Sequence, residues 1–277
     1  MEKILFLVDQ KGIDKSALDF ACYLADITHS KLNGIFMDPE NFRLGMAEKI
    51  LYESGEKQSA APLFSEPFRN TSLAEHKRAF ALACSSKGIR CLENKDSIFS
   101  AADIVKETRF ADLLIIGGQT SIGTLAETPP TALVKEILSK SECAVIIAPL
   151  DFTGIEEVIF AYDGSESSMY AIKQFTYLFP QFSVERVIYL QVNNQEGDEV
   201  VSHEKFSAFL QMHYSAVGYH VLHGKAGDEL FAYLLTKKNI LVVIGAYGRS
   251  AVSTALRKST AELLLKTTPL AVFITHH

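Results

Sequence analysis

Glycine-bearing turns and a few polar side chains in the second half of the chain have the types and spacing to hold a phosphate group. Asp163-Gly-Ser165 and Gly245-Ala-Tyr-Gly248-Arg249-Ser250 each follow a short apolar run, and nine residues separate Gly248 from Lys258-Ser259. Glycine lets the backbone approach a ligand, and successive N–H groups at a helix start form a concave site for anions. Arg249 adds a cation suited to phosphate oxygens, and Ser259 adds a hydroxyl. The pattern indicates either an anion site or turns that need glycine for structural reasons alone.

Alternating strands and helices would position these turns. Short apolar runs rich in β-branched residues predict strands, and the segments between them have the pattern of helices. Strands that alternate with helices form parallel βαβ units, in which ligands bind at the carboxyl ends of the strands. The predicted strands of the second half are residues 157–162, 184–192, 219–224, 240–244 and 270–275, and the predicted helices are residues 167–178, 198–217, 227–237 and 259–266.

The first half of the chain repeats this order. Asp9 ends the opening strand as Asp163 does, Gly117 corresponds to Gly245, and a longer excursion at about residues 39–70 has no readable role. The sequence therefore predicts two tandem α/β domains, residues 1–150 and 151–277, each a three-layer sandwich with a five-stranded, mainly parallel sheet. Two copies on a short linker predict a pseudo-dimer within one chain, with a homodimer as the further option.

Composition and charge exclude several classes of protein. The chain has 277 residues, of which 48% are hydrophobic and 22% are charged, so it can bury cores and is not a disordered or fibrous chain. The net charge of −6, without a basic block, argues against a surface for nucleic acid or anionic membrane. The longest apolar runs are far shorter than a membrane span, and the first strand does not suit an export signal, which together predict a cytoplasmic protein.

The cysteines and histidines show no spacing typical of metal or redox sites. His220 and His223 lie three apart on a predicted strand and therefore on opposite faces, which does not suit a shared metal. The cysteines form no CxxC pair, so buried free thiols without redox chemistry are the prediction. They are Cys22, Cys84, Cys91 and Cys143.

The span from Leu241 to Phe273 resembles the C-terminal signature of the universal stress protein family. The matching stretches are Leu-Val-Val-Ile-Gly245-Ala-Tyr-Gly248-Arg-Ser, Ser259-Thr-Ala-Glu262 and Thr268-Pro-Leu-Ala-Val272, and Val158–Ser165 (VIFAYDGS) is similar to the family's first strand and loop. The resemblance extends over the whole chain, more faintly in the first half. It implies an adenine-nucleotide α-hydrolase-like sandwich and a stress-response role. Members of the family that bind ATP carry Gly-x-x-Gly, nine residues, and then Gly-Ser or Gly-Thr.

The second domain matches this nucleotide motif at all but one position. Gly245 and Gly248 match, and Lys258-Ser259 stands where the family has glycine and then serine or threonine. Lys258 would either crowd the triphosphate or reach it as an added cation, and the sequence leaves both open. The resemblance places Ala161 and Asp163 against the adenosine, Val192 beside the base, and Gly245, Gly248, Arg249 and Ser259 at the phosphates of ATP or another adenine nucleotide, with Mg²⁺ as its companion.

The first domain departs further from the motif. Thr120 stands at the second glycine position, and Pro130-Thr131 stands at the closing pair. Proline has no backbone N–H, so Pro129 and Pro130 cannot donate to a phosphate. We expect no ATP in this domain and a mainly structural role for it.

Several functions are compatible with these residues. The first is a nucleotide-dependent regulator that acts on an unidentified protein partner, and the second is a dimerisation scaffold in which Lys258 closes the nucleotide site. An enzyme, such as a slow ATP hydrolase, is disfavoured because no general base or pair of metal-binding carboxylates stands near the candidate phosphate site. The last is a protein that binds another small ligand near residues 39–70.

Overall fold

The computed structural model describes residues 1–9, 11–37, 73–93, 100–121, 127–193, 203–245 and 270–275. In the first half, side-chain oxygens start three helices by accepting a hydrogen bond from a backbone N–H in the first turn: Asp14 caps α1, Ser100 caps α4 and Thr131 caps α5. The strands are β1 (Lys3–Val8), β2 (Lys31–Phe36), β3 (Cys91–Glu93), β4 (Leu113–Gly117) and β5 (Ala144–Ala148), and the helices are α1 (Lys15–Ile27), α3 (Leu73–Ser86), α4 (Ala101–Thr108) and α5 (Ala132–Lys140).

The second half has the same alternation of strands and helices. Ser165 caps α6 in the same way, by accepting from the Ser168 N–H. The strands are β6 (Glu157–Ala161), β7 (Arg186–Asn193), β8 (Ala216–His223), β9 (Ile240–Gly245) and β10 (Ala271–Thr275). The helices are α6 (Glu166–Leu178), the 3-10 helix η1 (Pro180–Val184), α7 (His203–His213) and α8 (Ala226–Leu235).

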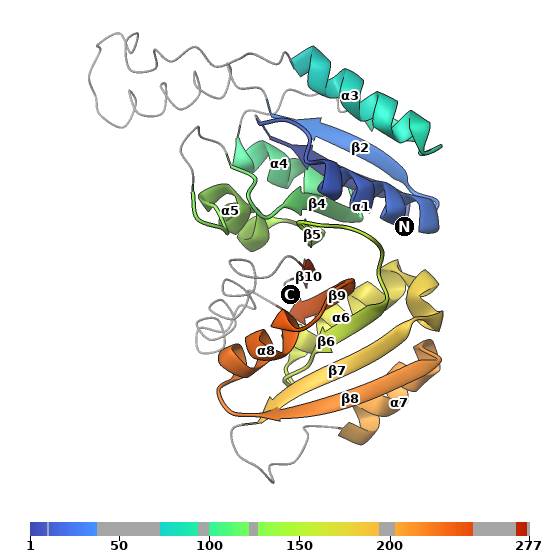
Figure 1. Ribbon diagram of the computed structural model, residues 1–277, viewed down its shortest axis with the longest axis vertical. Coiled ribbons are helices and arrows are strands. Elements are labelled where there is room, and N and C mark those ends of the chain that lie inside the picture. The colour runs from blue at the N-terminus through green and yellow to red at the C-terminus, as the bar shows by residue number, and fades with distance from the viewer. Residues whose placement is uncertain are drawn as a thin grey trace, which may run out of the picture.

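The ten strands of the described residues join one sheet in the order β3-β2-β1-β4-β5-β10-β9-β6-β7-β8 (Figure 1). Within each half the strands are parallel, as the pairing of β1 with β4 and of β6 with β9 shows. The two halves meet where β5 pairs with β10 in antiparallel fashion, with Ile146 opposite Phe273. The predicted α/β fold with mainly parallel strands is confirmed, and the two five-stranded sheets are continuous with each other.

Helices cover both faces of the sheet and make three layers. Phe20 of α1, Phe80 of α3, Phe175 of α6 and Phe206 of α7 are buried in one core. Ile104 of α4, Ile137 of α5 and Leu230 of α8 are buried in the core on the opposite face. No described helix is long and apolar enough to cross a bilayer.

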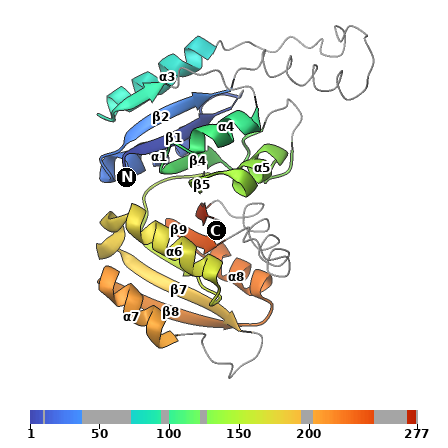
Figure 2. The ribbon, with the colours of Figure 1, turned by 180° about the vertical axis from the view of Figure 1, so that it is seen from behind.

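The twist of the sheet decides where the strand ends point. Seven strand-to-strand steps separate β2 from β7, and at about 20–25° per step the sheet rotates through roughly half a turn between them. The antiparallel junction reverses the strand direction, and the rotation of the sheet reverses it back. As a result, β2 and β7 both run from right to left in Figure 1 and from left to right in Figure 2. The carboxyl ends of these strands therefore face the same side of the molecule.

The predicted helix over residues 198–217 is wrong at its C-terminal end. The helix α7 ends at His213, and Ala216 already pairs with Arg186 of β7. The Ser215 N–H donates to the Ser183 carbonyl at 2.9 Å, so the chain has left the helix by then. The backbone edge of β7 needs hydrogen-bond partners, and this requirement outweighs the helix-like pattern of the sequence. The predicted helix 259–266 and the 39–70 excursion lie outside the described residues.

Candidate functional site

The carboxyl ends of the central strands in the second half bring the described site candidates to one edge of the sheet. Ala161 ends β6 and is in register with Leu190 of β7 and Ile244 of β9. Gly245 follows Ile244 as the last residue of β9, and Asp163 lies two residues beyond β6. Val192, near the end of β7, is half-buried and packs against the core that contains α8.

A tight turn fixes Asp163 at the start of α6. Its Oδ1 accepts hydrogen bonds from the Ser165 N–H at 3.0 Å and from the Ser165 hydroxyl at 2.5 Å. Gly164 between them has a φ of +76°, a conformation that favours glycine. The Ser165 hydroxyl oxygen in turn accepts from the Ser168 N–H. The carboxylate is thus held at the N-terminus of a helix, where the helix dipole stabilises its negative charge.

Gly245 lies in contact with the first turn of α6. A Cβ atom at Gly245 would lie 2.3 Å from the Ser167 carbonyl oxygen and 2.6 Å from the Ser168 nitrogen. Close backbone approach therefore requires glycine here, whether or not a ligand binds. Beside it, the buried Ser167 hydroxyl has no hydrogen-bond partner among the residues that the structure describes, which is unusual for a buried polar group.

The four remaining site candidates, Gly248, Arg249, Lys258 and Ser259, lie outside the described residues. The structure therefore brings together Ala161, Asp163 and Gly245 at the strand ends, and it does not test the predicted phosphate contacts.

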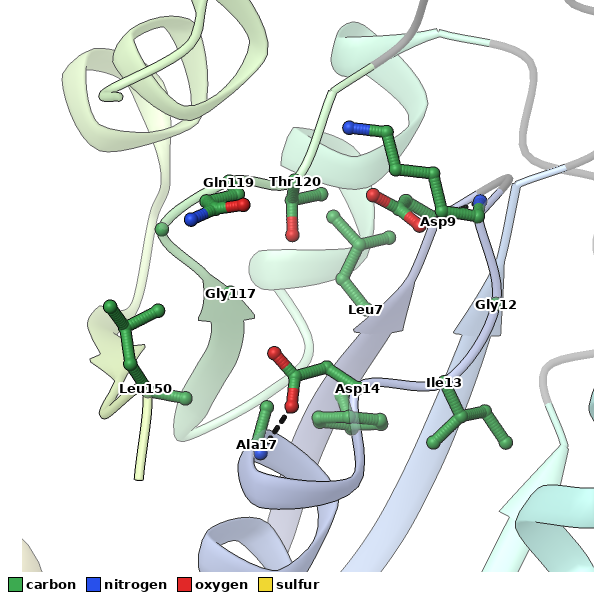
Figure 3. Close-up of a pocket in the computed structure, with 14 residues that line it drawn as sticks. Leu7, Asp9, Gly12, Ile13, Asp14, Ala17, Gly117, Gln119, Thr120 and Leu150 are labelled. Carbon is green, nitrogen blue, oxygen red and sulfur yellow. Dashed lines mark hydrogen bonds between the residues drawn. The ribbon is translucent and has the colours of Figure 1, made fainter. Parts of the chain in front are cut away.

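A cavity of about 270 Å³ occupies the corresponding place in the first half (Figure 3). Asp9 after β1 and Asp14 before α1 line it on one side, and the turn Gly117–Thr120 after β4 lines it on another. Pockets for drug-sized ligands have volumes of roughly 300–1,000 Å³, so this cavity suits a ligand smaller than ATP. The negative charges of the two carboxylates would also repel a triphosphate.

Burial shapes the electrostatics of this cavity. Removal from water raises the pKa of Asp9 above the usual value of 3.8, while hydrogen bonds from backbone N–H groups and the Lys11 charge act in the opposite direction. The Lys11 N–H donates to Asp9 Oδ1 at 2.8 Å. The Asp14 carboxylate accepts from the Ala17 N–H at 3.1 Å and so serves as the helix cap. Both carboxylates are thus engaged in holding the strand-to-helix connection.

Internal hydrogen bonds occupy the groups of the first half that correspond to the phosphate motif. The Thr120 N–H donates to the Gly117 carbonyl at 3.1 Å, which closes the turn on itself. The buried Thr131 hydroxyl donates to the Thr120 carbonyl and accepts from the Val134 N–H as the cap of α5. The Thr120 N–H and the Thr131 hydroxyl proton are therefore already used in internal hydrogen bonds.

Sequence reasoning missed part of the cavity wall. Asp14 was not singled out, although an Asp directly before an apolar helical pattern is a recognisable cap. His76 of α3 also lies close, because a Cβ atom at Gly12 would be 3.2 Å from His76 Nε2. No local pattern links Gly12 to a residue 64 positions later, so only the fold could show this contact.

Comparisons with solved structures agree with the architecture. A universal stress protein from Archaeoglobus fulgidus DSM 4304 has a TM-score of 0.67 at 15% identity, covering 99% of this chain and 98% of that one. A protein assigned as a universal stress protein from Pseudomonas aeruginosa UCBPP-PA14 has a TM-score of 0.61 at 15% identity, covering 100% and 93%. A functionally unknown protein from Pseudomonas aeruginosa PAO1 has a TM-score of 0.60 at 16% identity, covering 100% and 92%.

Sequence comparison adds no family assignment. No family model matches the chain, and no curated protein matches it significantly. At about 15% identity, the structural similarity is evidence of a shared fold alone. The chain has, over nearly its whole length, the fold of these universal stress proteins.

Proposed function

We propose that this chain is a cytoplasmic, stress-response regulatory protein that binds ATP or another adenine nucleotide in its second half. The observation that carries the proposal is the convergence of Ala161, Asp163 and Gly245 at one sheet edge, beside the start of α6. The Ser167 hydroxyl, which has no hydrogen-bond partner among the described residues, adds a buried hydrogen-bonding group at the same place. The sequence continues from Gly245 with the glycine, arginine, lysine and serine that a phosphate cradle uses.

The first half has a different role in this proposal. The Thr120 N–H in its turn and the Thr131 hydroxyl both donate hydrogen bonds to backbone carbonyls within the first half. Its cavity is small and is lined by two carboxylates. These features oppose a triphosphate there. One nucleotide per chain is therefore the expected stoichiometry, with Mg²⁺ bound to the nucleotide phosphates.

The proposed site lies close to the junction of the two halves. Gly245 is the last residue of β9, β9 pairs with β10, and β10 pairs with β5 of the first half. A nucleotide bound beside Gly245 would act on the strand next to but one from the junction, β9. The regulatory output we propose is a change in how the paired halves bind a protein partner.

Mass spectrometry of the small molecules released from the purified protein tests the proposal, followed by titration of the emptied protein with Mg-ATP. We expect about one adenine nucleotide per chain. Asp163→Asn keeps the turn acceptor but removes the charge, and it should weaken ATP binding by about tenfold, since one hydrogen bond to a charged group contributes about 1.5 kcal/mol or more.

Asp9→Asn is the matched control, because it makes the same change at the equivalent turn of the first half. It should leave ATP affinity unchanged. A protein that is purified empty and ignores added ATP would overturn the proposal, as would ATP binding that depends on Asp9 and not on Asp163.

The scaffold alternative makes a distinct prediction at Lys258. If this side chain closes the site, Lys258→Gly gains ATP binding that the natural chain lacks. A second alternative, a smaller ligand in the first half, is favoured by the defined cavity around Asp9 and Asp14. A released non-nucleotide compound whose binding is lost in Asp9→Asn would support it.

A further inference from the structure

A buried hydroxyl group points into the cavity of about 270 Å³ in the first half (Figure 3). It belongs to Thr120, which is only 6% exposed. The N–H and carbonyl groups of Thr120 are bonded to Gly117 and Thr131, whereas its hydroxyl has no hydrogen-bond partner among the described residues. Buried polar groups are nearly always hydrogen-bonded, so this hydroxyl favours a ligand that supplies the partner.

Asp14 presents a second polar group to the same cavity. Its Oδ1 accepts the Ala17 N–H at 3.1 Å as the cap of α1. Figure 3 shows the other oxygen of this carboxylate directed into the cavity, on the side opposite Thr120. Each carboxylate oxygen has lone pairs of its own, so Asp14 can cap the helix and bind a hydrogen-bond donor in the cavity at the same time.

The charges around the cavity favour a cation. Asp9, Asp14 and Lys11 are the charged residues among the described ones that line it, and together they carry a net charge of −1. The Lys11 side chain is exposed, whereas Asp9 is half-buried. Burial raises the pKa of Asp9 because its ionised form loses water there, and a cation bound nearby would stabilise that form.

The backbone groups that an anion would need are already used in this part of the cavity wall. The N–H groups of Lys11 and Gly12 donate to Asp9, and the Thr120 N–H donates to the Gly117 carbonyl. The second Asp14 oxygen and the Thr120 hydroxyl oxygen accept hydrogen bonds. The matching ligand therefore carries one positive charge and several N–H donors, and an ammonium group has three such donors in a compact head.

Apolar side chains set the character of the rest of the ligand. Leu7, Ala17 and Leu150 also line the cavity (Figure 3). A hydrocarbon chain in contact with them is removed from water, which favours binding. The chain is short, because a cavity of about 270 Å³ lies below the size of pockets for drug-sized ligands.

We propose that this cavity binds a small primary alkylamine in its ammonium form. The ammonium group donates to the second Asp14 oxygen and to the Thr120 hydroxyl, close to the Asp9 carboxylate, and the alkyl chain contacts the apolar wall. The site is separate from the nucleotide site proposed for the second half and does not depend on it. The same head group occurs in free amines and in lysine side chains, and we assign the site to a free amine.

An NMR titration of the full chain without nucleotide tests this proposal, with isotope-labelled methyl groups of leucine and threonine. The probes are butylammonium, butan-1-ol and butanoate, which have the same number of carbon atoms and differ in the head group. We expect butylammonium to shift the methyl signals of Leu7, Thr120 and Leu150 with millimolar affinity, since so small a ligand makes few contacts. Butan-1-ol should bind about tenfold more weakly, and butanoate should leave these signals unchanged.

Substitutions assign the two polar contacts. Asp14→Asn keeps a good helix cap but removes the charge, so it should weaken butylammonium binding by about tenfold. Thr120→Val keeps the shape of the side chain without its hydroxyl and should weaken binding by about fivefold, whereas Thr120→Ser should restore it. The matched control is Asp228→Asn, which removes a charge at the start of α8, where the side chain is 63% exposed. It should leave the affinity unchanged.

The source of the amine is tested with Nα-acetyl-lysine amide, which carries the same head group on a longer body. Tighter binding of butylammonium supports a free amine, and tighter binding of the lysine derivative would overturn that assignment. The proposal itself is overturned if butanoate binds as well as butylammonium, if the cavity methyl signals do not move, or if Asp228→Asn weakens binding as much as Asp14→Asn. The ATP titration reports on the second half, so failure of either proposal leaves the other intact.

Discussion

At the scale of single residues, Asp9 and Asp163 occupy equivalent turns and have related geometries. Each carboxylate accepts the N–H of the residue two positions later, Lys11 and Ser165 respectively. Each turn contains a glycine with positive φ: Gly12 at +105° and Gly164 at +76°. In the first half, the loop after β4 closes on itself through the hydrogen bond from the Thr120 N–H to the Gly117 carbonyl. Each carboxylate therefore holds the turn between a strand and the helix that follows it.

Asp9→Asn should stabilise the protein at neutral pH. Because burial raises the pKa of Asp9 in the folded state above 3.8, the folded chain binds its proton more tightly than the unfolded chain does. The contribution of Asp9 to the free energy of unfolding therefore falls as pH rises from about 3.8 through the raised pKa. Asparagine keeps the acceptor for the Lys11 N–H and carries no charge, so it avoids this loss.

The measurement is urea unfolding of both proteins from pH 4 to pH 7. The urea midpoint of Asp9→Asn should exceed that of the natural chain by a margin that grows with pH. A margin that is constant across this range would show that ionisation of Asp9 is not its cause.

At the scale of elements, the contact between β9 and α6 sets the layer spacing at the candidate site. Gly245→Ala places a methyl group within 2.3–2.6 Å of backbone atoms of Ser167 and Ser168, which cannot turn aside as a flexible side chain would. Overpacking of this kind costs about 1–3 kcal/mol or more of unfolding free energy. We expect a loss of this size in chemical unfolding.

Gly218→Ala is the matched control for this substitution. Gly218 also lies on a strand of the second half, but its added Cβ would meet only Ile188 Cγ1, at 3.6 Å, which is an ordinary contact. The free energy of unfolding of the Gly218→Ala protein should differ from that of the natural chain by less than about 0.5 kcal/mol. Equal effects of the two substitutions would rule out the close approach as the cause.

How far the sequence predicts these elements depends on the kind of information each needs. Strands such as β4 and β9 are short apolar runs that end in glycine, and composition alone identifies them. The start of β8 depends on hydrogen bonds to the backbone edge of β7. The sequence before β8 has a helical pattern, so the predicted helix over residues 198–217 extends too far. The contact of Gly12 with His76 joins residues on different elements, and spacing along the chain carries no signal for it.

At the scale of the whole molecule, the pairing of β5 with β10 makes one sheet from two. Every residue of both strands is buried, so neither strand is suited to be an exposed edge. The motif spacing predicted two copies of one unit, but it could not show that their last strands pair, because this contact involves only the apolar pattern common to any buried strand.

Residues 1–150 produced alone should therefore self-associate. Without β10, the apolar edge of β5 lacks its hydrogen-bonding partner, and pairing with β5 of a second copy restores it. Light scattering after size exclusion should give the mass of a dimer, and addition of residues 151–277 should convert it to a 1:1 complex. A stable monomer of residues 1–150 would contradict the view that this edge demands a partner.

The half-turn of the sheet between β2 and β7 gives the molecule a front and a back. The ends of these strands open toward one side, so the Asp9 cavity and the Asp163 turn belong to a single front, in spite of the antiparallel junction. A macromolecule that binds to the front can contact both halves at once, so its binding depends on the state of both. A macromolecule that binds to the back contacts the opposite ends of the strands and reaches neither the Asp9 cavity nor the Asp163 turn.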